Sequence, residues 1–405
     1  MRKKFLFSTG ILILFLVLFT SEKILFSQDK INRNSPEHSW QWQILVIPPK
    51  SGWDNEPGRS ISNALAWCEK EISASGSGVG GHDINFIRFA IPEGANIKNL
   101  SFNLNSASIA VMSFADYETD KILVERLSGN QIPLILSGGE DILLDENGPP
   151  IKNIFALDLY RDYRCSTFAK YAKKIFKPDA RVALAAGRFT LNQEREAKIC
   201  YDFLDRAGFM PMPFWADASV RDTFNMMSEE IESQENNPGV MITFLGSMGS
   251  REIWRNFMRI RTAWRLWNCT APAESFLSCR GMVFADQNIK LPESGGFTDL
   301  KRHIWMTRAL HITDTVAAGR AIALSEWIKM AVNSLPQPVN EISRPALLKA
   351  LENVKNIPFG NQKLNINPNL HRPYSRNIYI VEVRDHNYKL LDTISTEGMK
   401  YTRQY

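Results

Sequence analysis

Two successive series of alternating strand and helix patterns constrain the fold of this chain more than any other feature. The first series opens with an apolar run at 43–49 (QILVIPP), continues with helical spacing at 61–72 and ends with a strand at 133–136. The second series repeats the alternation between a strand at 153–159 and a strand at 240–245. Continuous Val, Ile, Leu and Ala runs are typical of parallel strands that are buried on both faces. We therefore expect an α/β fold with two doubly wound, Rossmann-like lobes.

The last third of the chain continues with helical patterns and closes with a β-rich tail. Its expected elements are a helix over 251–267, a strand over 281–285, a helical region over 299–333, a helix over 344–353, and strands over 363–366, 377–383 and 388–393. No internal repeat of short period is visible, which excludes solenoid architectures.

The N-terminus has the composition of a secretion signal. Residues 2–4 are basic, 10–19 is almost purely apolar, and Ser21 and Ser27 are small residues at plausible cleavage positions. The apolar stretch is shorter than the ~20 residues that cross a bilayer comfortably, which favours cleavage. We therefore expect a signal peptide over 1–27, a linker over 28–40 and a periplasmic protein. An uncleaved signal would instead anchor the protein to the membrane.

Composition and charge limit the classes of partner. The chain has 405 residues, of which 44% are apolar and 22% charged, as in soluble globular proteins. Residues 1–27 contain four basic residues and one acidic residue, so the remainder has 44 basic against 42 acidic residues. This near balance gives no reason to expect a nucleic-acid or anionic-membrane partner.

The chain has five cysteines, an odd number for an exported protein. Cys269 and Cys279 bracket a short Pro-containing segment, and the oxidising compartment permits a disulfide between them. We predict this pair. Cys68 lies on an expected helix among apolar residues and is expected to be a small buried side chain. No cysteine has the paired short spacing of a zinc or redox site.

Motifs of catalysis are missing from the sequence. It contains no G-x-S-x-G, no Walker loop and no H-E-x-x-H, and its six histidines form no metal-like pair. The run at 76–81 (GSGVGG) satisfies G-x-G-x-x-G, but it follows a helix and precedes a strand, which is the reverse of a dinucleotide site. We expect a turn there, and we predict no enzyme, no cofactor and no metal.

An Arg- and Trp-rich segment at 251–268 invites two interpretations. Its five Arg and three Trp are compatible with a membrane-surface or nucleic-acid helix. An amphipathic helix with an inward apolar stripe, including Trp264 and Leu266, accounts for the same pattern. We adopt the second interpretation.

Several segments, taken in order, resemble the type I periplasmic solute-binding proteins of the leucine/isoleucine/valine-binding family. The opening strand with its Pro and Ser-Gly (IPPKSG) looks like the start of that family. IPLILSGG resembles its strand ending in a Ser-rich ligand loop, and FALDLYRDY resembles its crossover into the second lobe. IPFGNQKLNINPNLHRPYSRNIYIVEV resembles its closing β segment. The similarity covers about residues 41–395.

The resemblance implies two lobes that are joined by a hinge and hold the ligand in a cleft between them. The expected lobes are 41–158 plus about 288–335, and 159–287 plus about 336–405. Ligands of open parallel sheets bind outside the carboxyl ends of the strands. The expected ligand-binding residues therefore follow strands: Trp53, Ser113, Ser137, Gly138, Arg188, Ser247 and Asp286.

Each of these residues also has a structural interpretation. Ser113 and Ser137 are suited to helix caps or turns, and Asp286 to capping a turn. Trp53 can shield the edge of a core, although in the family an aromatic residue in this loop often closes over the ligand. Arg188 can face solvent. It stands where relatives that bind amino acids usually carry Asp followed by Tyr-Gly, and this departure puts an amino-acid ligand in doubt.

The function that the resemblance implies is capture and delivery of a small solute. The protein would close around a small polar solute, such as an amino acid or a related carboxylate or amide, and present it as a monomer to an ABC permease at the inner membrane. The alternative is a sensing module of the same fold that reports ligand occupancy to a partner protein.

Overall fold

The computed structural model describes residues 41–91, 101–102, 104–138, 150–158, 161–177, 180–187, 191–216, 225, 229, 239–260, 263–269, 276–286, 309–336, 341–359, 362–374 and 377–396. The described residues all belong to one compact unit, Gln41–Tyr405. The predicted signal peptide and linker therefore lie outside the described residues, as do Arg188 and most of the segment 217–238.

A parallel sheet of five strands forms the first lobe, with the order β2-β1-β3-β4-β5. Its strands are β1 (Trp42–Ile47), β2 (Ile84–Arg88), β3 (Ser108–Ser113), β4 (Leu134–Leu136) and β5 (Ile154–Ala156). Alternate residues of β1 face different cores, because successive strand side chains point to opposite faces. Ile44 and Val46 pack in one core with helices α2 (Gly58–Ala74), α9 (Thr315–Asn333) and α10 (Arg344–Asn353). Leu45 and Ile47 pack in the other with α3 (Tyr117–Leu127).

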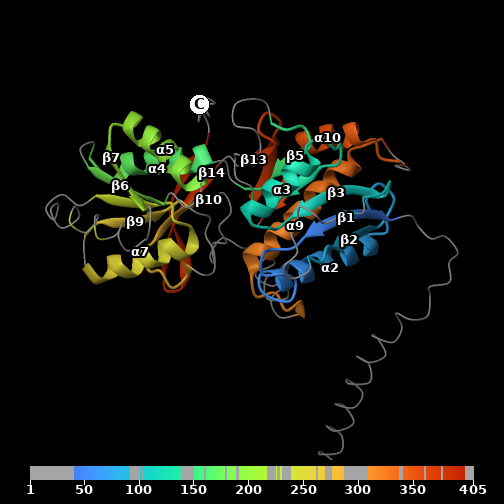
Figure 1. Ribbon diagram of the computed structural model, residues 1–405, viewed down its shortest axis with the longest axis horizontal. Coiled ribbons are helices and arrows are strands. Elements are labelled where there is room, and N and C mark those ends of the chain that lie inside the picture. Colours follow the sequence, from blue (N-terminus) through green and yellow to red (C-terminus); the bar gives the residue numbers. More distant parts are fainter. Residues whose placement is uncertain are drawn as a thin grey trace, which may run out of the picture. The chain divides into compact units, whose positions relative to one another are not determined.

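The second lobe is built on a seven-stranded sheet with the order β15-β14-β10-β9-β8-β6-β7. Its strands are β6 (Arg181–Gly187), β7 (Met210–Ala216), β8 (Val240–Thr243), β9 (Arg265–Asn268), β10 (Val283–Asp286), β14 (Asn377–Arg384) and β15 (Asn387–Ser395). Strands β6 to β10 are parallel, and β14 and β15 are antiparallel. Helices α4 (Arg161–Ile175) and α5 (Leu191–Arg206) cover one face, and α7 (Gly246–Ile260) covers the other (Figure 1). Both sheets are thus doubly wound, as the sequence predicted.

The C-terminal region contributes elements to both lobes. Helix α10 contributes Leu347 and Leu351 to the core of the first lobe. The small sheet β11 (Ile357–Phe359), β12 (Gln362–Asn367) and β13 (Arg372–Tyr374) contributes Ile357 and Leu364 to the same core. Only β14 and β15 join the second sheet. Apolar residues up to 366 thus pack in the core of the first lobe, beyond the expected boundary near residue 335.

The predicted helix over 251–267 is wrong in its second half. Helix α7 spans Gly246–Ile260, and β9 then runs between β8 and β10. Ile253 and Phe257 do form the inward stripe of the helix. Trp267 instead lies on the strand and faces the opposite core with α4 and α5. The Gly-rich run at 76–81 is the expected turn, since Gly76, Gly78, Gly80 and Gly81 all have positive φ.

The predicted disulfide is also wrong. Cys165 of α4 is bonded to Cys200 of α5, while Cys269 and Cys279 are buried free thiols. Cys269 packs in the core on the α4 and α5 side of the sheet, and Cys279 packs on the α7 side. Short spacing in the sequence therefore does not bring their sulfur atoms together, because the two cysteines face opposite sides of the sheet.

Candidate ligand site

Polar residues follow the carboxyl ends of strands in both sheets. Ser137 and Gly138 come directly after β4, Asp158 follows β5, and Asp286 is the last residue of β10. Parallel strands place their carboxyl ends at one edge of a sheet, where ligands of such folds bind. Three of these four residues were expected to contact a ligand.

A network of four charged side chains joins these strand ends. Arg320 of α9 donates from Nη1 to the carbonyl of Ser137 at 2.9 Å, and its Nη2 lies 3.5 Å from Oδ1 of Asp158. The same Asp158 oxygen lies 3.9 Å from Nη2 of Arg164 in α4. That Nη2 lies 3.8 Å from Oδ2 of Asp286. Two cations and two anions thus connect Ser137 in the first lobe with Asp286 in the second.

Arg164 is the most enclosed member of this network, with only 3% of its surface exposed. Its Nε donates to the carbonyl of Ala285 at 3.2 Å, and its Nη1 donates to that of Cys269 at 2.9 Å. Nη2 reaches no hydrogen-bond acceptor among the described residues. Burial by itself lowers the pKa of Arg164, but Asp158 and Asp286 raise it above its ordinary value, so the guanidinium stays charged.

Arg320 is the second guanidinium of the network and lies on α9 in the first lobe. It projects from an otherwise apolar stretch of α9 and is partly exposed, with 20% of its side chain accessible. A Cβ atom on Gly138 would lie 3.8 Å from Nη1 of Arg320, which is an ordinary contact distance. The main chain after β4 therefore lies next to a guanidinium that is accessible to solvent.

Ser113 has its hydroxyl group committed to the start of α3. The residue is fully buried, and its Oγ donates to Oδ1 of Asp120 at 2.5 Å and accepts from the N–H of Ala115 at 3.2 Å. The N-cap of α3 is Asp116, which accepts from the N–H of Thr119. Ser113 thus organises the turn after β3, as its structural interpretation anticipated.

Asp120 gives a testable consequence of that arrangement. Burial raises its pKa to about 7, with a smaller rise from Asp116 and an opposing effect of the Ser113 hydroxyl. A carboxyl with a raised folded pKa stabilises the protein at low pH, and this contribution is lost as the pH rises through about 7. We expect Asp120→Asn to raise the melting temperature at pH 8 relative to the wild type, and to change it less at pH 5. Scanning calorimetry at both pH values tests this, with the exposed Glu118→Gln on the same helix turn as the control.

The remaining expected site residues are placed as follows. Trp53 donates from its indole nitrogen to the carbonyl of Phe89 at 2.8 Å and packs against the core of the first lobe, which agrees with a shielding role. Ser247 lies in the first turn of α7, after β8, and its side chain is outside the described part of the chain. Arg188 lies outside it altogether.

Sequence reasoning missed Asp158, Arg164 and Arg320 as members of the site. Asp158 lies in the FALDLYRDY segment, and Arg164 follows that segment closely, so both accompany the crossover from the first lobe to the second. Arg320 is a lone cation in the apolar sequence TVAAGRAIAL, and such a residue needs a partner when its helix is packed against a core. A single charge in an apolar helix was therefore the sequence signal that could have identified Arg320.

Known proteins resemble this chain in fold but not closely in sequence. No protein-family model and no curated protein matches the chain. An ABC transporter substrate-binding protein from Desulfitobacterium hafniense has 11% identity and a TM-score of 0.67, and the match covers 87% of this chain and 100% of that one. The leucine-binding protein LivK from Thermotoga maritima has 12% identity and a TM-score of 0.66 over 88% of this chain and 99% of its own. A solute-binding protein from R. palustris in complex with benzoate has 14% identity and a TM-score of 0.65 over 88% and 96%.

These matches confirm the resemblance at the level of the fold. Nearly the whole length of each solved structure is covered, so the likeness extends to both lobes. Among the residues that the structure describes, no helix has the length and apolar character needed to cross a membrane. The chain therefore has the two-lobed fold of the type I periplasmic solute-binding proteins of the leucine-binding type.

Proposed function

We propose that this protein is an exported solute-binding protein that captures a small polar solute and delivers it to an ABC permease. The observation that carries the proposal is the charged network at the carboxyl ends of β4, β5 and β10, which is where ligands of such sheets bind. The similar folds of ABC transporter substrate-binding proteins and the signal-like N-terminus support it.

The chemistry of the network favours a ligand with polar groups and little net charge. Two guanidinium groups and two carboxylates balance each other, so the site offers both donors and acceptors without an excess of either charge. An amino acid is such a ligand: in this proposal its carboxylate would be held beside Gly138 and Arg320, and its ammonium group beside Asp286. Similar solved structures include one in complex with leucine, one in complex with benzoate and a fatty acid ABC transporter substrate-binding protein, so leucine, benzoate and fatty acids are the first probes to compare.

Thermal-shift measurements on the mature protein test the proposal. A solute that binds only the folded state raises the melting temperature, by an amount that grows with its concentration. We expect at least one probe among amino acids, aromatic carboxylates, amides and fatty acids to produce a concentration-dependent rise. The absence of a shift with every class would contradict solute binding, and turnover of a probe would indicate an enzyme instead.

Two variants locate the site once a solute is found. Among the described residues, only Arg320 lies within 4 Å of a Cβ added to Gly138, so Gly138→Ala is expected to fold normally. We expect this variant and Asp286→Asn to weaken binding of the solute by at least about tenfold, which corresponds to ~1.4 kcal/mol. Gly129→Ala is the matched control, because its added Cβ contacts nothing within 4 Å. Unchanged affinity in both site variants would place the ligand elsewhere.

A further inference from the structure

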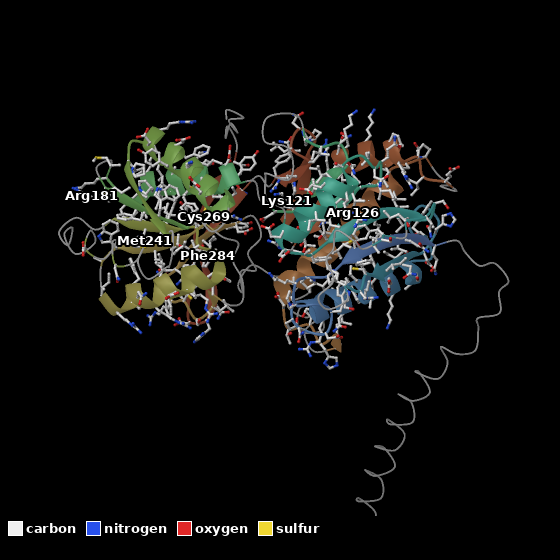
Figure 2. All side chains as sticks on the ribbon, in the orientation of Figure 1. Lys121, Arg126, Arg181, Met241, Cys269 and Phe284 are labelled. Carbon is white, nitrogen blue, oxygen red and sulfur yellow. A yellow bond between two sulfur atoms is a disulfide. The ribbon has the colours of Figure 1, made fainter. Side chains whose placement is uncertain are left out.

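Three cysteine sulfur atoms form a compact cluster in the core of the second lobe. Cys165 and Cys200 are bonded to each other. Sγ of Cys269 lies 3.9 Å from Sγ of Cys165 and 3.8 Å from Sγ of Cys200. All three residues are completely buried, and Figure 2 shows Cys269 among the packed side chains of this lobe.

Separate elements bring these three sulfurs together. Cys165 belongs to α4, Cys200 to α5, and Cys269 directly follows β9, which lies in the middle of the sheet that both helices cover. Next to the cluster, the rings of Phe168 and Trp267 stack with their centroids 5.0 Å apart and join α4 to β9. The packing of the core thus holds the three sulfurs close together.

We propose that Cys165, Cys200 and Cys269 form a thiol–disulfide exchange site, in which Cys269 can replace either partner of the existing disulfide. The short distances from Cys269 to both bonded sulfurs carry this inference, because attack along the Cys165–Cys200 bond from either end then requires only a local shift of the Cys269 side chain. The proposal does not depend on the solute-binding function.

The exchange is balanced without an external oxidant. The thiol of Cys269 loses its proton, and its sulfur forms a bond to Sγ of Cys165 while the bond from Cys165 to Cys200 breaks. Cys200 leaves as a thiolate and takes up a proton. Attack on Cys200 instead releases Cys165. One disulfide and one thiol are present before and after each step.

Burial keeps this exchange slow in the resting protein. It raises the pKa of Cys269, with a further rise from Glu196 and an opposing effect of Arg164, so the reactive thiolate is scarce. The carbonyl of Cys269 accepts the hydrogen bond from Arg164. A new disulfide at Cys269 would therefore alter the residue whose carbonyl accepts a hydrogen bond from Arg164, a member of the charged network.

Counting thiols in single serine variants of the full-length protein tests the proposal. The wild type has five cysteines and one disulfide, which leaves three thiols for alkylation after denaturation. We expect Cys165→Ser and Cys200→Ser each to keep a disulfide through Cys269, and so to expose two thiols. Peptide mapping by mass spectrometry should identify the pairs Cys200–Cys269 and Cys165–Cys269. Cys279→Ser is the matched control, which keeps Cys165–Cys200 and also exposes two thiols.

Two results would overturn the exchange site. The first is four alkylatable thiols in both Cys165→Ser and Cys200→Ser, together with a folded circular-dichroism spectrum. If a variant does not fold, the wild type supplies the second measurement. It is reduced with dithiothreitol, re-oxidised with diamide and mapped by mass spectrometry, and disulfides that contain Cys269 are expected beside Cys165–Cys200. Recovery of Cys165–Cys200 alone contradicts the proposal.

Discussion

Replacement of Arg164 by alanine is expected to lower the free energy of unfolding by about 3–5 kcal/mol, because it removes one partner of a buried ion pair. Nη2 of its guanidinium lies 3.8 Å from Oδ2 of Asp286, which is itself only 6% exposed. The substitution also removes the donors to the carbonyls of Ala285 and Cys269. Urea unfolding followed by circular dichroism measures the loss.

A double-mutant cycle separates the charge from the packing of the side chain. Asp286→Asn in the Arg164→Met background should cost less than in the wild type, since the cation that faces Asp286 is already gone; coupling between contacting residues is about 0.5–3 kcal/mol. Arg255→Ala on the exposed face of α7 is the control and should change stability by no more than ~0.5 kcal/mol. Equal losses for Arg164→Ala and Arg255→Ala would show that the network does not stabilise the fold.

The sequence predicted those parts of the fold whose signal is local. The run at 43–49 includes all of β1 except its first residue, Trp42. The residues of β1 are nearly all buried, and continuous apolar runs of this kind identify strands covered on both faces. Strand β9 was missed because its four residues follow closely on an amphipathic helix. A short apolar run cannot be assigned to a strand or a helix by periodicity alone.

The candidate site was predictable only on its strand side. Ser137, Gly138 and Asp286 could be named because they follow strands, and the ends of parallel strands gather at one edge of a sheet. Arg164 and Arg320 come from helices, and the sequence does not show which helical residue meets which strand end. Asp158 and Arg320 pair across 162 positions of the chain, and local sequence patterns do not predict contacts at such a separation.

The cysteine pairing also could not be predicted from local sequence. Cys269 and Cys279 are close in sequence but face opposite cores of one sheet, whereas Cys165 and Cys200 are 35 positions apart and meet between two adjacent helices. Which face of a sheet a cysteine occupies depends on the register of its strand and on the helix that covers it. The spacing of cysteines in the sequence gives neither the register of the strand nor the helix that covers it.

Gly58→Ala is expected to destabilise the protein by about 3 kcal/mol, at the upper end of the usual range for overpacking. A Cβ on this buried residue would lie 1.9 Å from the carbonyl oxygen of Gly52 and 3.0 Å from Cα of Trp53. Both are main-chain atoms, so relief requires the loop after β1 to move. Gly52 resists such movement, because its N–H donates to the carbonyl of Pro49 at 2.8 Å.

The same substitution tests whether the loop after β1 takes part in binding. Because Trp53 is carried by this loop, displacement of Gly52 should also weaken binding of any solute found by thermal shift. Chemical unfolding and solute titration of Gly58→Ala measure both effects, with Gly129→Ala as the control, because a Cβ added to Gly129 meets nothing within 4 Å. A loss of stability with unchanged affinity would assign Trp53 to the core edge alone. Stability within ~0.5 kcal/mol of the control would mean that the loop yields freely, contrary to the packing around Gly58.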